Sequence, residues 1–140
     1  MGDKREEAMG FMQNSQYDLA IPLFIDLLES DPADYSIHYM LGQCYKFNGQ
    51  LTEALKSLIK SEELINDVKS DHMKGKIYLA LGIAYQENDE FDKAVATLKK
   101  GVEKTPQDWT LHNSLGLTYK YLSNFKESLF SYFRAQELIV

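Results

Sequence analysis

The sequence contains few of the residues that build several common kinds of site. Among its 140 residues Cys44 is the only cysteine, which excludes an internal disulfide and a zinc site made of cysteines. It has no apolar run of about 18 residues or more, so no transmembrane helix is expected. Lysine and arginine number 15 against 21 aspartates and glutamates, and the basic residues form no cluster. Nucleic acid is therefore not an expected partner, because phosphate binding needs a concentrated basic face.

The N-terminal segment also lacks the features of a secretory signal. Residues 1–12 include Asp3, Glu6 and Glu7, whereas a signal peptide has a basic start and an apolar centre. Together with the absence of a long apolar run, this predicts a cytoplasmic protein without membrane insertion.

The stretch from Tyr78 to Pro106 has the pattern of two helices joined by a turn. Apolar residues recur in it every three or four positions, in two stripes separated by the polar sequence Glu87-Asn88-Asp89. Pro106 ends the second stripe because it lacks a backbone donor and its ring clashes with the preceding helical turn. The stripes are formed by Tyr78, Leu81, Gly82 and Tyr85, and by Phe91, Ala94, Val95, Leu98 and Val102.

Small residues in both stripes predict a close approach of the two helices. Glycine inside a helix costs roughly 1 kcal/mol relative to alanine, so Gly82 needs a packing reason. We expect Gly82 and Ala94 to face each other, with the large rings of the stripes filling the space beside them.

The same template recurs along the chain. Leu115, Gly116 and Tyr119 repeat it 34 residues later, and Gly42 lies 40 residues before Gly82. A 34-residue helix-turn-helix period with L-G-x-x-Y, an aromatic, a small residue and a final proline resembles the tetratricopeptide repeat. The two remaining copies contain Leu41, Gly42, Tyr45, Leu51, Ala54 and Leu58, and Ala8, Phe11, Tyr17, Ala20, Phe24 and Pro32.

This resemblance implies an all-α fold, a right-handed superhelical solenoid of four tetratricopeptide-like helix-turn-helix repeats. We expect one domain over residues 1–140, with repeats at about 1–34, 35–74, 75–108 and 109–140. The step of 40 places six extra residues in the second repeat, within the segment 66–74. We expect them to lengthen one or both flanking helices around a turn at Lys69-Ser70, with Ser70 or Asp71 as the cap. Asp34 and Asp108 are expected to cap the helices that follow them.

No group of residues suggests catalysis, a cofactor or a metal. His38 and His112 occupy the same position two copies apart and are expected on the order of 20 Å from each other, too far to share one ion. His72 has no metal-binding spacing to its neighbours, and no glycine-rich phosphate loop is present. We therefore predict that the protein is not an enzyme and binds neither a cofactor nor a metal.

The resemblance also implies a binding groove lined by the first helices of successive repeats. Met, Leu, Ile and aromatic side chains are frequent at the implied groove positions, beside lysines and amides that can orient a peptide. The alternative is that some of the apolar residues only pack against neighbouring helices. The implied groove residues are Tyr39, Gln43, Lys46, Phe47, Lys76, Leu79, Ile83, Asn113, Leu117, Lys120 and Tyr121, together with Arg5, Met9, Met12 and Gln86.

One subclass of the family clamps the C-terminal carboxylate of heat-shock chaperones with lysine, arginine and asparagine side chains. The matching positions here are Arg5, Met9, Met40, Lys76 and Ala80, so both amides of the clamp are missing. Recognition of chaperone tails is disfavoured.

The sequence thus predicts a protein-interaction module that binds a peptide or partner helix in the groove, as an adaptor or scaffold. The alternative is a self-association module, because the last predicted helix carries exposed apolar residues at Phe130, Phe133 and Ile139. That helix would form a homodimer or pack on a further domain.

Overall fold

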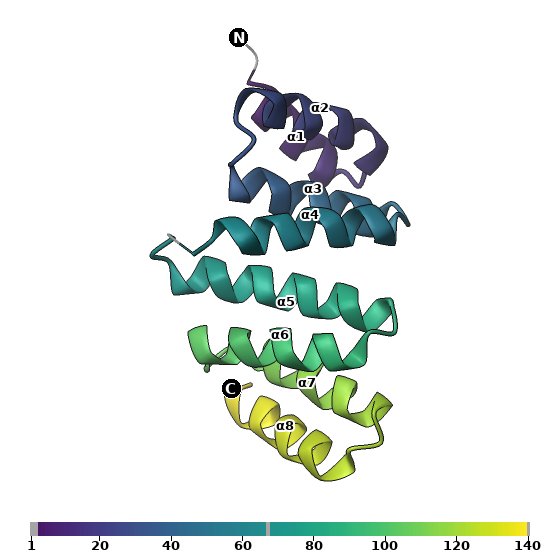
Figure 1. The fold of residues 1–140 in the computed structure, drawn as a ribbon, viewed down its shortest axis with the longest axis vertical. Coiled ribbons are helices and arrows are strands. Elements are labelled where there is room, and N and C mark those ends of the chain that lie inside the picture. The colour runs from purple at the N-terminus through teal and green to yellow at the C-terminus, as the bar shows by residue number, and fades with distance from the viewer. Residues whose placement is uncertain (1–2, 67, 140) are drawn as a thin grey trace. The chain divides into compact units, whose positions relative to one another are not determined.

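The computed structural model describes residues 3–66 and 68–139, and these residues form eight α-helices and no strand. The predicted all-α fold of helix-turn-helix repeats is confirmed. The helices, in chain order in Figure 1, are α1 (Lys4–Gln13), α2 (Tyr17–Ser30), α3 (Tyr35–Phe47), α4 (Leu51–Leu64), α5 (Asp71–Glu87), α6 (Phe91–Lys104), α7 (Trp109–Tyr121) and α8 (Phe125–Leu138).

Contacts between the helices divide the chain into two compact units, Met1–Asp67 and Val68–Val140, which we call unit 1 and unit 2. Each unit contains two helical hairpins, α1–α2 and α3–α4 in unit 1, and α5–α6 and α7–α8 in unit 2. We call the earlier helix of a hairpin its first helix and the later one its second helix. The expected single domain over residues 1–140 stays a prediction.

Two aspartates fix the starts of first helices, as the sequence predicts. The carboxylate of Asp34 accepts hydrogen bonds from the backbone amides of Ser36 and Ile37 at 3.0 and 3.3 Å. Asp108 accepts one from the amide of Thr110 at 3.0 Å. These bonds satisfy amides that have no partner inside the helix.

The two histidines at equivalent positions hold the turn that precedes each first helix. Nε2 of His38 lies 2.8 Å from the carbonyl oxygen of Pro32, and Nε2 of His112 lies 2.9 Å from that of Pro106. Both are ring nitrogen to carbonyl hydrogen bonds in which the ring nitrogen donates. The histidines therefore have a structural role in each unit.

The nearest contact at Gly82 is made by a leucine of the second helix, which the sequence did not single out for this position. A Cβ built on Gly82 would lie 2.5 Å from Cδ2 of Leu98, so the side chain of Leu98 occupies the space over the glycine. Ala94, the expected neighbour, lies one helical turn earlier in α6. Gly42 has the same relation to Leu58, at 2.7 Å. The glycine is needed because the leucine side chain fills the space that a Cβ would occupy.

Four of the six extra residues lengthen a single helix, and the other two lie in the connection that precedes it. α5 has 17 residues, whereas the first helices α3 and α7 have 13 each. The hydroxyl of Ser70 accepts a hydrogen bond from the amide of Met73 at 3.2 Å, which confirms the expected cap. α4 keeps the 14 residues of the second helix α6, so the insertion extends the start of α5.

Each unit has a buried apolar cluster between its hairpins. Phe24, Ile37 and Leu41 belong to the cluster of unit 1, and Leu98 and Leu111 to that of unit 2. Across the described residues, no helix combines the length and apolar character needed to cross a bilayer.

Candidate functional site

An apolar pocket of about 340 Å³ opens between the first helices of unit 1. α1 and α3 supply most of its lining, and the first residue of α2 closes one side. We call it the first-helix pocket. Its lining residues are Met9, Met12, Gln13, Tyr17, Met40 and Phe47.

Three of these six side chains are methionines, and two others are aromatic. Met9 is 37% exposed and Phe47 is 58% exposed, so part of the apolar lining is open to a ligand. The ring of Phe47 stacks on that of Tyr17 at 5.5 Å between centroids, and Nζ of Lys46 lies 5.4 Å from the Phe47 ring centroid. Methionine is flexible and polarizable, so such a lining can adapt to different apolar side chains.

Polar groups accompany the apolar lining on α3. Tyr39 is half-buried, and burial raises the pKa of its hydroxyl above the ordinary value, although a hydrogen bond with Gln43 acts in the opposite direction. Oε1 of Gln43 is buried, and no described residue donates a hydrogen bond to it. A buried acceptor without a donor is costly, so this oxygen is an unfavourable feature of α3 in the structure.

Arg5, a predicted groove residue, is engaged within unit 1. Its guanidinium lies 3.6 Å from the Asp34 carboxylate and donates a hydrogen bond to the Ser36 hydroxyl at 3.2 Å. Arg5 thereby joins α1 to the start of α3, and a structural role accounts for its charge.

In unit 2 the predicted groove residues lie on α5 and α7. Lys76, Asn113 and Lys120 are exposed, while Ile83 and Leu117 are half-buried. Their exposure leaves all five within reach of a ligand on this face.

Two further residues of that face have structural contacts. Leu79 packs against the buried cluster of unit 2, so part of its surface belongs to the core. Tyr121 is 58% exposed and its ring stacks on that of Phe91 at 5.0 Å between centroids.

The positions in unit 2 equivalent to the first-helix pocket are more polar. Residues of unit 2 follow their counterparts in unit 1 by 74 positions, so Ile83, Gln86 and Ser114 replace Met9, Met12 and Met40. Oε1 of Gln86 accepts a hydrogen bond from the hydroxyl of Thr118 at 3.0 Å, which joins α5 to α7. The methionine lining is a property of unit 1.

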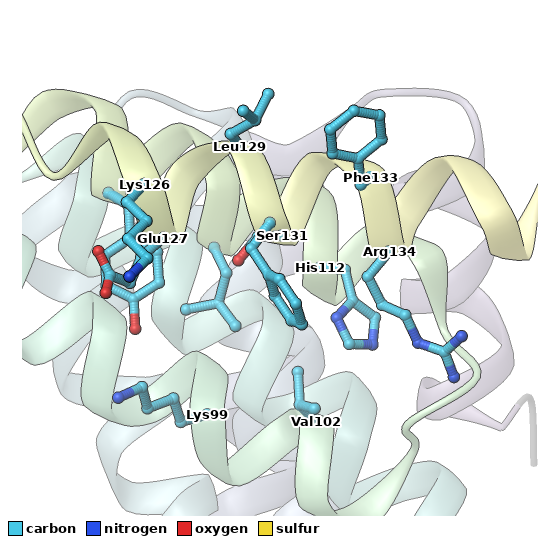
Figure 2. A pocket seen from close by; sticks show the side chains of 12 residues that line it. Lys99, Val102, His112, Lys126, Glu127, Leu129, Ser131, Phe133 and Arg134 are labelled. Atoms are coloured by element: carbon cyan, nitrogen blue, oxygen red, sulfur yellow. The ribbon is translucent and has the colours of Figure 1, made fainter.

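A larger pocket, of about 650 Å³, lies in unit 2 beside its second helices. Figure 2 shows Lys99 and Val102 of α6 on one side of it and α8 on the other, with Arg134 extending past His112 of α7. Its lining residues are Lys99, Val102, His112, Leu115, Tyr119, Lys126, Glu127, Leu129, Phe130, Ser131, Phe133 and Arg134.

Unit 1 has a counterpart of this pocket with a volume of about 280 Å³. The floor is similar, because His38, Leu41 and Tyr45 correspond to the same residue types in unit 2. The rim differs, because Lys56 stands where unit 2 has Phe130. We call the two the second-helix pockets. The pocket of unit 1 is lined by Leu28, His38, Leu41, Tyr45, Glu53, Lys56, Ser57 and Lys60.

Several lining residues were not among the predicted site residues. Tyr17 was assigned only to the repeat pattern, yet it forms one wall of the first-helix pocket. An aromatic that opens a second helix and another that ends the next first helix, 30 residues later, recur as the stacked pairs Tyr17–Phe47 and Phe91–Tyr121. This spacing is a sequence signal that could have identified the wall.

The described residues contain no group of three or more histidine, cysteine, aspartate or glutamate side chains placed to hold a metal ion. Burial raises the pKa of the Cys44 thiol to about 11, so this thiol is protonated near neutral pH. A protonated, buried thiol is a poor nucleophile.

Two family models described as tetratricopeptide repeat match the chain, one over residues 34–107 and one over residues 79–137. The first match covers more than half of the 140 residues. Together the matches reach three of the four helical hairpins.

Curated relatives share the sequence at low identity. BBSome complex member BBS4 of Bos taurus is 28% identical over 113 residues, which is 81% of this chain and 20% of the relative. Lipopolysaccharide assembly protein B of Escherichia coli K12 is 26% identical over 90 residues, 61% of this chain and 23% of the relative. The chain thus spans about a fifth to a quarter of the length of these relatives.

Solved structures of MamA have the same fold. MamA from Desulfovibrio magneticus RS-1, from residue 41 to its end, matches with a TM-score of 0.84 at 20% identity, over 97% of this chain and 75% of that one. A crystal structure of MamA matches with a TM-score of 0.83 at 22% identity, over 94% of this chain and 68% of that one. These matches agree with the helical repeat fold described above.

Proposed function

The chain belongs to the tetratricopeptide-repeat family, and from that membership we propose that it is a protein-interaction module whose first helices bind a peptide or a partner helix. The fold and the relatives support a protein-interaction role in general. The specific site is our proposal. In unit 1 the proposed apolar anchors are Tyr39 and Phe47, the polar guides are Gln43 and Lys46, and the first-helix pocket adds Met9, Met12 and Met40. In unit 2 the proposed anchors are Leu79, Ile83, Leu117 and Tyr121, and the polar guides are Lys76, Asn113 and Lys120.

The observation that carries this proposal is the first-helix pocket of unit 1. Its volume of about 340 Å³ is enough for a large apolar side chain of a ligand, and its methionines can adjust to that side chain. Gln13 adds one polar side chain to the otherwise apolar and aromatic lining. An apolar pocket with a polar side chain at its edge suits the binding of a peptide.

The charges at the proposed binding positions favour an acidic partner. The whole chain has a formal charge of −6, yet these positions contain Lys46, Lys76 and Lys120 and no carboxylate. Positive side chains in a negatively charged protein attract negative groups locally and steer them during association. We infer a ligand segment in which a large apolar residue is flanked by aspartate or glutamate.

An adaptor or scaffold fits this arrangement. Among the relatives, BBS4 is named as a member of a complex and the Escherichia coli protein as an assembly protein. A comparable role for this chain needs no catalytic group, and we propose that it acts in the cytoplasm.

The proposal can be tested with a random peptide library displayed on phage and selected against the full chain. We expect the selected peptides to share a large apolar residue next to acidic residues. Their affinity, measured by calorimetry, should fall at least about tenfold with Met9→Glu or Phe47→Glu, because each change places a charge on the apolar lining.

Leu19→Glu is the matched control. Leu19 is 46% exposed on α2 and does not line the first-helix pocket, so this variant should keep the affinity of the unchanged protein. Equal affinity of all variants for the selected peptides would contradict the assignment of the site.

A further inference from the structure

One side of α8 presents an exposed apolar stripe. Phe125, Leu129 and Phe133 are spaced four residues apart and are 64%, 58% and 59% exposed. Figure 2 shows Leu129 and Phe133 on the side of α8 turned away from Lys99 and Val102 of α6. Phe130, on the flank of this stripe, is 76% exposed. Four large apolar side chains therefore meet solvent along one helix.

At equivalent positions the second helices α2 and α6 are covered by a helix of their own unit. In unit 1, Tyr17 stacks on Phe47 of α3, and Ile21 packs against the buried cluster. In unit 2, Phe91 stacks on Tyr121 of α7, and Val95 packs against the cluster that includes α7 residues. This side of a second helix is thus shaped to be covered by another helix, and no described helix covers it on α8.

The first helix of a second copy is a poor match for this stripe. In α3 the residues that join the buried cluster include Ile37 and Leu41. The residues at the equivalent positions, 34 earlier, are Asp3, the N-cap of α1, and Glu7 within α1. Docking α1 on the phenylalanines would bury carboxylates without a partner, which is strongly unfavourable.

α8 itself is a good match for α8 of a second copy. With 100° between successive residues, Lys126 and Glu137 lie on the same flank of the stripe, one near each end of the helix. In an antiparallel pair related by a two-fold axis, Lys126 of each copy comes beside Glu137 of the other. In a parallel pair the flanks that carry Lys126 and Glu137 would instead lie on opposite sides of the interface, so these charges would not pair.

We propose that α8 is a self-association surface, on which two copies of this chain pack their α8 helices antiparallel across a two-fold axis. Phe125, Leu129 and Phe133 form the buried centre of the interface. The pairing of Lys126 in one copy with Glu137 in the other favours the antiparallel orientation of the two helices. The rim of the larger second-helix pocket, at Leu129, Phe130 and Phe133, borders the contact.

The size of this surface sets the strength of the association. An aromatic side chain buries about 150–250 Å² when fully covered, so the partly exposed side chains of the stripe contribute on the order of 500 Å² per copy. A stable dimer commonly buries about 800 Å² per partner. The dimer therefore belongs to the weak class, with dissociation at micromolar or higher concentration.

Sedimentation equilibrium of the full chain from about 1 µM to about 500 µM, which spans this weak class, tests the proposal. We expect a reversible shift from monomer to dimer. Leu129→Glu should weaken the dimer at least about tenfold while the far-ultraviolet circular dichroism is unchanged, and Leu129→Ala should weaken it less. Leu19→Glu, at an exposed apolar residue of α2, should leave the dimer intact. The proposal is overturned if the protein remains a monomer throughout this concentration range, or if Leu129→Glu leaves the dissociation constant of the dimer unchanged.

A charge exchange tests the antiparallel direction. Lys126→Glu and Glu137→Lys should each weaken the dimer by placing like charges across the interface, and the double variant should restore it. At high salt these differences should shrink, because the charges lie at the exposed edge. A double variant no stronger than the single ones overturns the antiparallel arrangement.

Discussion

Unit 1 and unit 2 are built on the same hairpin pattern but expose apolar surface in different places. In unit 1 the methionine-lined pocket lies between the first helices α1 and α3, while the second-helix pocket measures about 280 Å³ and has Lys56 on its rim. In unit 2 the second-helix pocket measures about 650 Å³ and has Phe130 on its rim. The positions that face the first helices there include Gln86 and Ser114 instead of methionine.

Comparing the two units distinguishes residues that stabilise the fold, which are the same in both, from residues at the pocket rims, which differ. His38 and His112 hold the preceding turn in the same way, and Gly42 and Gly82 both accommodate a leucine of the second helix. The residues at the pocket rims make no contact of this kind that the fold requires. Substitutions there change what each unit can bind without changing its helices.

The largest effects are expected from the shared scaffold. Leu41 in α3 of unit 1 and Leu81 in α5 of unit 2 occupy the same position of the repeat, with 5% and 0% exposure. Replacing either by alanine should lower the free energy of unfolding by about 2–5 kcal/mol, because each change leaves a cavity in a close-packed core. Urea unfolding at low protein concentration measures the change.

Leu129→Ala serves as the control for these core variants, because Leu129 is 58% exposed. It should change the free energy of unfolding of the monomer by less than about 0.5 kcal/mol. A stability-neutral Leu81→Ala would show that the repeat register is wrong.

An intermediate effect is expected from exchanging the rims of the second-helix pockets. Phe130→Lys gives unit 2 the rim residue of unit 1 and should weaken self-association by about tenfold, or roughly 1.4 kcal/mol, since it removes apolar surface beside the interface. Lys56→Phe gives unit 1 the opposite rim and should increase the binding of an apolar dye. If Lys56→Phe left dye binding unchanged, the rim residue would not account for the difference between the pockets.

The smallest effect is expected at the helix caps, where the units are most alike. Asp34→Ala should lower the free energy of unfolding by about 0.5–2 kcal/mol, since the first amides of α3 lose their acceptor. Asp108→Ala should have a similar effect on α7. A change of less than about 0.3 kcal/mol in both variants would contradict the capping role.

The cap at Asp34 also predicts a dependence on pH. Burial alone would raise the pKa of Asp34, but hydrogen bonds from the Ser36 hydroxyl and from the amides of Ile37 and Ser36, with Arg5 nearby, lower it below the ordinary value of 3.8. The stabilisation is therefore present above about pH 4 and is lost as the pH falls through the lowered pKa. Asp34→Asn should show a smaller loss of stability on acidification than the unchanged protein.

The repeat pattern allowed much of the fold to be predicted. The period of 34 residues located the hairpins, and Asp34, Ser70 and Asp108 were recognised as caps because a short polar side chain precedes an apolar stripe. The contact of Gly82 with Leu98 was missed, because a stripe gives the face of a helix but not which residue of the neighbouring helix fills the gap.

The candidate site was harder to predict than the fold. The resemblance to the family suggested Met9, Met12 and Phe47, but Tyr17 and Met40 join them only through the packing of three helices. Similarly, Phe130 and Phe133 stood out as apolar residues, whereas the antiparallel pairing of Lys126 with Glu137 depends on where they lie around α8. Such arrangements depend on side chains from several helices, which a one-dimensional pattern does not specify.

The most direct test of the account compares Phe47→Ala with Tyr121→Ala in the binding of one selected peptide, measured by calorimetry. The two residues are equally exposed, at 58%, and each stacks on the first residue of a second helix. Only Phe47 borders the methionine-lined pocket. We predict that Phe47→Ala weakens binding at least about tenfold and clearly more than Tyr121→Ala, as expected for a residue at the centre of a binding site. Equal losses, or a larger loss for Tyr121→Ala, would contradict the placement of the binding pocket in unit 1.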